Sequence, residues 1–224
     1  MMILYNFTIK ALNQSLYTID KLKKFKIEGY TNGVICFHQD VTLKEVMHTT
    51  TFLYKIGLCS FWNIVSRAET LPGIPLEKQM SVLPRKNIWD VENYYFKDER
   101  VTLLYNILVK IKSSYFIAQY EDYLSRKLRY SLKLKEFYLT DKLINSLSKV
   151  VEKDILEMQK STYEFIVTTI NGIENHTIVN CEQYTKEIII YVSQITSKLH
   201  NIYIKYSHLL HSKRYVSSEV QGVI

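Results

Sequence analysis

The clearest pattern in the chain is an apolar stripe at helical spacing that follows Thr140. Seven apolar residues recur at intervals of mostly three or four, with Lys, Asp and Glu between them: Leu143, Ile144, Leu147, Val150, Val151, Ile155 and Met158. This spacing gathers the apolar side chains on one side of an α-helix and leaves the other side charged. It predicts an amphipathic helix over Asp141–Gln159 that packs its apolar side against the rest of the chain.

The segment before this helix is typical of β-structure. Val101–Lys112 and Ser114–Tyr120 are rich in Val, Ile, Tyr and Thr, and they meet at Ser113. Leu128–Tyr138 alternates apolar residues with lysine, as a strand with one solvated face does. We expect a hairpin followed by a third strand.

The segment after the helix gives a second hairpin signal. Asn171-Gly172 separates the apolar runs Phe165–Ile170 and Ile173–Val179. Asn-Gly tolerates positive φ at both central positions of a two-residue turn, so it favours a β-hairpin. Lys186–Ile195 and Ile202–Tyr206 are further strand candidates, with a helix over Thr185–Leu199 as the alternative.

The first part of the chain predicts two helices and two strands. A helix over residues 1–28 is followed by a short strand at Val34–His38. A second helix, capped by Asp40, is expected to end at Gly57, because glycine readily takes the positive φ that closes a helix. Leu58–Ser66 alternates too little for a half-exposed strand and predicts a buried one.

All three prolines of the chain fall within one stretch, Leu71–Lys97. A loop of this length is unusual inside a compact domain, so it is either a binding arm or a surface excursion. The predicted fold class is α+β: a mixed or antiparallel sheet with two or three packed helices and this proline-rich insertion. Its core spans residues 29–207, between a helical extension (1–28) and a polar tail (208–224).

Composition limits the classes of function. The 224 residues carry a net charge of +7, which suits nucleic acid, anionic lipid or an acidic protein surface as a partner. Three widely spaced cysteines fit neither a disulfide framework nor a metal site, so a reducing compartment is expected. No apolar run approaches the length of a transmembrane helix.

The residues that could carry chemistry are few. Six scattered glycines cannot build a phosphate-binding loop. His208 and His211 share a helical face, but nothing nearby completes a metal site, and His176 reads as a surface turn residue. Cys36 and Cys59 lie in apolar segments and read as buried fillers. We therefore expect no catalytic centre, no metal and no cofactor held by this chain alone.

Two basic stretches, Lys21–Lys26 and Arg126–Lys135, interleave cations with aromatic or apolar residues. In nucleic-acid-binding proteins such cations neutralise phosphates while aromatic rings stack on bases. At strand spacing the same lysines are the solvated face of a sheet. RNA binding is therefore the alternative functional hypothesis.

Read in order, the predicted elements resemble the NuoC-type subunit of respiratory complex I, also called the thirty-kilodalton subunit or NADH dehydrogenase subunit nine. The resemblance is carried by the order of short stretches: Val34–His38, Phe52-Leu53, Phe61–Pro72, Arg100–Leu108 with Tyr105-Asn106, the helix over Asp141–Gln159, Asn175-His176, Ile204–Tyr206, and Lys213-Arg214 through Glu219. The family's Gly-x-x-Gly-His-Pro and Asp-Phe-Pro motifs are absent between Asn180 and Asn201.

The resemblance implies a structural subunit of mitochondrial NADH:ubiquinone oxidoreductase on the matrix side of the inner membrane. Such a subunit binds no cofactor and contacts the quinone-module and iron–sulfur subunits. The matching positions supply the candidate interface residues, namely Arg100, Tyr105, Tyr206, Lys213, Arg214 and Glu219.

Overall fold

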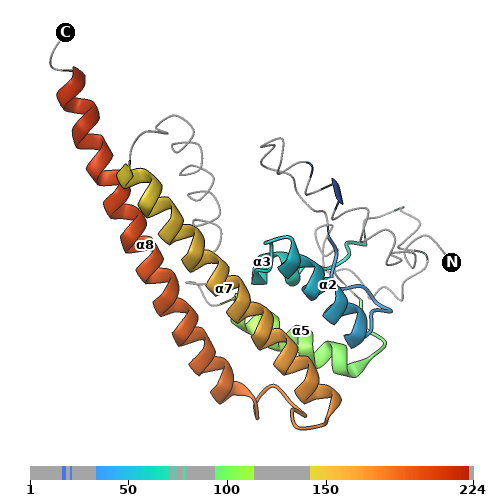
Figure 1. Cartoon of the computed structure of the whole chain (residues 1–224). Helices are drawn as coiled ribbons and strands as arrows, with labels where there is room; N and C mark the ends of the chain where they lie inside the picture. Colours follow the sequence, from blue (N-terminus) through green and yellow to red (C-terminus); the bar gives the residue numbers. More distant parts are fainter. Residues whose placement is uncertain are drawn as a thin grey trace.

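The computed structural model describes residues 17–18, 21, 34–70, 73, 78, 94–113 and 142–221. Within this part the helices are α2 (Leu43–Lys55), α3 (Phe61–Ile64), α5 (Glu99–Lys112), α7 (Lys142–Glu174) and α8 (Thr185–Gln221) (Figure 1). Side chains are described throughout except at positions 143–144, 147–148, 151, 202–203, 205–207 and 209–221.

The predicted α+β fold is wrong, because the structure is mostly helical and its described residues form no sheet. Extended backbone pairs at an isolated parallel bridge between Phe37 and Arg67. There the Phe37 amide donates to the Ser66 carbonyl, and the Phe37 carbonyl accepts from Ala68. The strand expected at Val34–His38 is reduced to this bridge. The strands expected at Ser114–Tyr120 and Leu128–Tyr138 lie outside the described residues, as do nearly all of the 1–28 helix and most of the proline-rich insertion.

Helix α2 forms where the sequence predicts a helix, but a different residue caps it. The Thr42 side chain accepts from the Glu45 amide, and Glu45 accepts in return from the Thr42 amide, so Thr42 rather than Asp40 is the N-cap. Leu43, Val46 and Leu53 are buried on one face. Gly57 follows with φ +75°, as expected for the residue that ends this helix.

Two segments expected to be strands form α3 and α5 instead. Within Leu58–Ser66, the Ser60 side chain caps a single helical turn. Over Val101–Lys112 the residues are helical, and those that become buried are spaced three, four or one apart on one face: Val101, Leu104, Ile107, Leu108 and Ile111. The β-branched composition favoured a strand, but this spacing can bury a single face only as a helix.

Helix α7 confirms the amphipathic helix expected over Asp141–Gln159 and continues 15 residues further, to Glu174. The hairpin expected around Asn171-Gly172 is therefore wrong. Ile166, Ile170 and Ile173 continue the buried stripe of the helix past this pair. The chain reverses only at His176, which adopts φ +57°.

Helix α8 replaces the strands expected at Lys186–Ile195 and Ile202–Tyr206, and the helical alternative for Thr185–Leu199 is correct. It runs antiparallel to α7 (Figure 1). Hydrogen bonds join Tyr191 to Thr162 (3.3 Å) and Lys198 to Ser161 (2.9 Å) across the pair. We call α7, α8 and their connection the hairpin.

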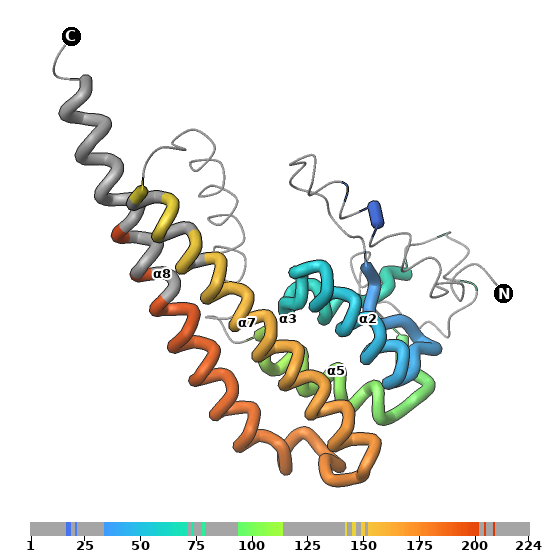
Figure 2. Tube along the Cα trace, in the orientation of Figure 1, coloured from blue at the N-terminus to red at the C-terminus, as the bar shows by residue number. Residues whose placement is uncertain are grey.

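Residues 34–70 and 94–113, which we call the head, pack against this hairpin (Figure 2). The Phe61 ring of α3 meets the rings of Phe165 and Tyr191, with centroids 6.4 and 5.9 Å apart. On α2, Tyr54 stacks on Tyr163 at 4.6 Å. One continuous core therefore joins the head to the facing halves of both long helices.

Candidate functional site

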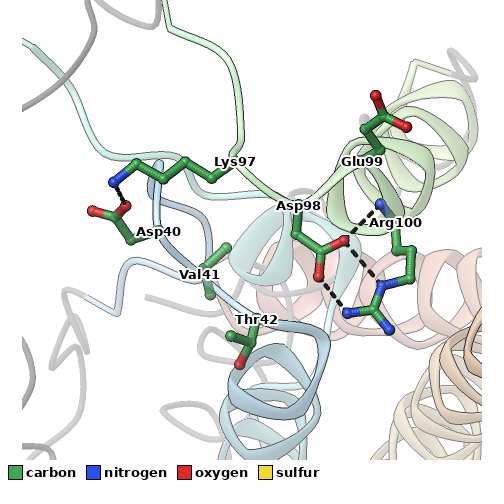
Figure 3. A pocket seen from close by; sticks show the side chains of 7 residues that line it. All are labelled: Asp40, Val41, Thr42, Lys97, Asp98, Glu99 and Arg100. Carbon is green, nitrogen blue, oxygen red and sulfur yellow. Dashed lines mark hydrogen bonds and ion pairs between the residues drawn. The ribbon is translucent and has the colours of Figure 1, made fainter.

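An open depression lies between the starts of α2 and α5, and it is lined by charged residues (Figure 3). Lys97 forms an ion pair with Asp40 on one side. On the other side the Arg100 guanidinium donates to both carboxylate oxygens of Asp98, at 3.0 and 2.8 Å. Both cations of the depression are thus paired with an acid, and Glu99 adds a third carboxylate to its lining.

The helix ends at this depression already have acceptors. Asp98 accepts from the Arg100 amide at 2.9 Å, and Glu45 accepts from the Thr42 amide at 2.9 Å. The hydrogen bonds from Arg100 hold the pKa of Asp98 below its usual range, so this carboxylate is ionised and occupied at neutral pH. The arrangement joins two helix starts and offers neither a general acid nor an anion site.

Tyr105 is half-buried in the head, in an aromatic cluster around Arg67. Its ring centroid is 5.0 Å from that of Phe37 and 5.2 Å from that of Phe96. The Arg67 guanidinium lies 4.0 Å from the centroid of Tyr94, and it donates to the Tyr94 carbonyl. This cation–π cluster holds the bridge at Phe37 in place, so the Tyr105 ring serves packing.

The other four residues that the resemblance proposed for an interface, Tyr206, Lys213, Arg214 and Glu219, are on helix α8. Their side chains fall outside those described. Arg100 itself is exposed at the start of α5. These interface assignments stay predictions.

The histidines and cysteines give no reactive centre within the described residues. His208 is exposed on α8 and His176 is exposed in the turn after α7, as expected for the latter. No group of His, Cys, Asp and Glu there could hold a metal ion. Cys36 and Cys59 are buried, as predicted, and burial raises the pKa of the Cys36 thiol to about 12.

A polar hollow lies where α7 passes into α8, and it includes Asn171, Asn175 and Gln183. The backbone N–H of Gln183 donates to the Asn180 side chain at 2.6 Å, and the Thr177 hydroxyl donates to the Gly172 carbonyl at 3.0 Å. These two bonds help to close the connection, and Ile178, Tyr184 and Glu187 also line the hollow. It can accept polar groups but positions no nucleophile beside a base.

Helix α8 carries an exposed face that the sequence reading did not identify. Ile188, Ile195 and Leu199 are buried against the fold. On the opposite side a row of residues is exposed, which we call the outer face of α8: Ile190, Ser193, Ser197, Asn201, Ile204 and His208. Ile190 and Ile204 keep 55% and 39% of their surface exposed, so this face is partly apolar.

The same helix has a distinctive charge pattern. Between Ile188 and Ser218 there is no Asp or Glu, whereas Lys198, Lys205, Lys213 and Arg214 all lie within this stretch. A count of charges along the helix would have revealed it. Dividing the segment into two strands and a tail hid it, because the stretch then crossed three predicted elements.

Neither the described helices nor the comparisons place the chain in a known class. No helix in the described part of the chain is long and apolar enough to cross a membrane. The chain matches no model of a known protein family, no curated protein and no solved structure.

Proposed function

We propose that this chain is a non-catalytic binding protein that works within a larger assembly and docks there through the outer face of α8. The observation that carries the proposal is the difference between the two faces of this helix. Its inner face holds it to the fold, while Ile190 and Ile204 on the outer face remain exposed. Partly apolar surface of this kind is typical of protein interfaces.

Membership of the matrix arm of respiratory complex I is one specific version of this proposal. It rests on the order of the short stretches from Val34–His38 to Glu219. The α+β fold that the resemblance implies is not the fold of the described residues, so the support is confined to the sequence. In this version the partners are quinone-module and iron–sulfur subunits.

An RNA-binding protein is the second candidate. The observation that favours it is the absence of acidic residues between Ile188 and Ser218 of α8. The basic stretch first considered for this role, Arg126–Lys135, lies outside the described residues.

Native purification of the tagged full-length chain from its own cells tests the proposal. We expect it to migrate well above its monomer mass of 26.5 kDa, together with partner proteins. Co-migrating NADH dehydrogenase subunits support the complex I version, and ribosomal or other RNA-associated proteins support the second candidate. Recovery of the chain as a free monomer at native expression would contradict both.

A matched pair of variants tests the docking face. Ile190→Ser with Ile204→Ser changes the outer face of α8, and Leu156→Ser with Val150→Ser changes equally exposed apolar residues of α7, at 61% and 41%. We expect only the α8 variant to leave the assembly. Equal losses from both variants, with circular dichroism unchanged, would exclude the outer face as the docking surface.

A further inference from the structure

The two helices of the hairpin pack side by side (Figure 1) but carry different charge patterns. Over α7, four lysines are matched by five acidic residues. Two of the lysines lie near the acid one turn later, Lys153 with Glu157 at 3.8 Å and Lys160 with Glu164 at 3.7 Å. Helix α8 contains five cationic residues and only two acidic ones. Both acids, Glu187 and Glu219, lie near the helix ends.

The described contacts between the two helices do not require this imbalance. The described contacts between the helices are of two kinds: apolar contacts, and hydrogen bonds in which at most one partner is charged. The bond from Tyr191 to Thr162 is of the second kind. Lys198 reaches Ser161 rather than a carboxylate. Excess positive charge along one helix repels itself and lowers stability slightly. An acid-free helix therefore calls for an anionic partner.

We infer that the acid-free stretch of α8, Ile188–Ser218, binds the phosphate backbone of a nucleic acid. The inference rests on the proposed binding role of α8 and gives its partner a chemistry. At about 1.5 Å per residue, the stretch extends over roughly 45 Å, enough to follow several successive phosphates. Exposed His200, Asn201 and His208 add donors of the kind that position a protein on sugar and phosphate.

An anionic membrane fits the same charge less well. A helix that lies in the surface of a bilayer buries its apolar face among the lipid chains. In α8 that face, with Ile188, Ile195 and Leu199, is already packed within the fold. Lys198 is exposed, but the apolar anchor is not.

Fluorescence anisotropy with a labelled single-stranded oligouridylate, and with an oligothymidylate of equal length, tests the inference on the full-length chain. If four cations contact phosphates, the logarithm of the binding constant falls by about 2.8 for each tenfold rise in salt concentration. Affinity is therefore expected to fall about 50-fold between 50 and 200 mM salt. Comparing the two oligonucleotides shows whether the ribose 2′-hydroxyl contributes.

A triple variant with a matched control locates the site. Lys205→Gln, Lys213→Gln and Arg214→Gln together leave one cation in the stretch, so the same salt change is expected to weaken binding only about threefold. Lys142→Gln, Lys149→Gln and Lys153→Gln remove the same charge from exposed positions of α7 and are expected to keep the steep dependence on salt. Circular dichroism confirms that both variants fold.

Three results would overturn the inference: no binding of either oligonucleotide at 50 mM salt, equal losses in the two triple variants, or binding only to phosphatidylserine-containing vesicles. Each is separable from a failure of the proposed function. If the chain still co-purifies in an assembly that resists ribonuclease and deoxyribonuclease, the outer face of α8 keeps its role and its partner is a protein.

Discussion

The head and the hairpin share one core, yet their remaining side chains serve different ends. In the head, polar and aromatic residues are engaged locally: Thr42 and Asp98 cap helices, and three aromatic rings enclose Arg67. In the hairpin, one apolar stripe per helix holds the pair, and the outer face of α8 takes no part. The caps and the Arg67 cluster of the head thus serve structure, while both regions keep exposed apolar side chains: Trp62 and Tyr95 on the head, Ile190 and Ile204 on α8.

The largest effect is expected where the two regions meet. Ile166 is fully buried on α7, so Ile166→Ala should lower the free energy of unfolding by about 2–5 kcal/mol. Leu156→Ala, on the exposed side of the same helix, should change it by less than about 0.5 kcal/mol. Urea denaturation measures both. Similar values for the two would mean that the stripe does not hold the hairpin.

The end of α7 offers a test of how tightly the hairpin closes. A Cβ added at Gly172 would lie 2.6 Å from Cδ1 of Ile178, which is buried. Gly172→Ala should therefore destabilise by about 1–2 kcal/mol, after the roughly 1 kcal/mol that alanine gains as a helix former. Adding Ile178→Val removes the opposing methyl and should recover part of the loss. Stabilisation by Gly172→Ala alone would show that this close contact does not exist.

Within the head, a cap should matter more than the ion pair beside it. Asp98→Ala removes the acceptor for the Arg100 amide and should cost about 1 kcal/mol, whereas Asp98→Asn keeps an equally good cap and should cost a few tenths. Thermal unfolding of both variants measures the difference. Equal losses would assign the effect to the exposed ion pair with Arg100.

The head should also respond to acid through His38. Burial lowers the pKa of this histidine below 6.5, against the opposing influence of Glu45 and Asp40. The unfolded chain then binds the proton more readily, so this contribution is present above about pH 6.5 and is lost as the pH falls. His38→Asn keeps an acceptor for the Asp40 amide, now at 3.3 Å, and does not titrate. Between neutral and mildly acidic pH, the urea midpoint of the wild type should therefore fall more than that of the variant, so that the two midpoints approach each other.

The smallest effect on stability separates fold from binding most sharply. Asn201→Glu places a carboxylate three residues after Lys198 and four before Lys205, within the acid-free stretch. Stability should stay constant or rise by about 0.3–0.5 kcal/mol, because the new charge pairs along the helix. Affinity for the oligonucleotides should fall at the same time. A loss of stability would show that the missing acids serve folding instead.

The sequence predicted the helices whose apolar residues keep a strict helical spacing. The helix that ends at Gly57 and the first half of α7 are of this kind. Prediction failed in α5 and in the second half of α7, which are rich in Ile, Val, Thr and Tyr, and in α8 the helix over Thr185–Leu199 was only the alternative to a strand. In these helices burial overrides the strand preference of β-branched residues: Thr162 and Thr169 are buried inside α7.

The candidate site was harder to predict than the fold. Resemblance pointed to Tyr105, whose ring lies among Phe37, Phe96 and Arg67 in the structure. The outer face of α8 became visible only once one helix replaced two strands, because exposure depends on which residues face α7. The charge pattern of α8 was present in the sequence, but the residues that form it were divided among three predicted elements.

The contact of Phe61 with Tyr191 has a consequence for biosynthesis. The two residues are 130 positions apart, and a ribosome adds about 5–20 residues per second. Synthesis of Tyr191 therefore follows synthesis of Phe61 by on the order of ten seconds. During this time Phe61 and its apolar neighbours in the head are not covered by α8. A chain that stops before α8 never receives that cover, so truncated products should be the forms that chaperones retain and proteases remove.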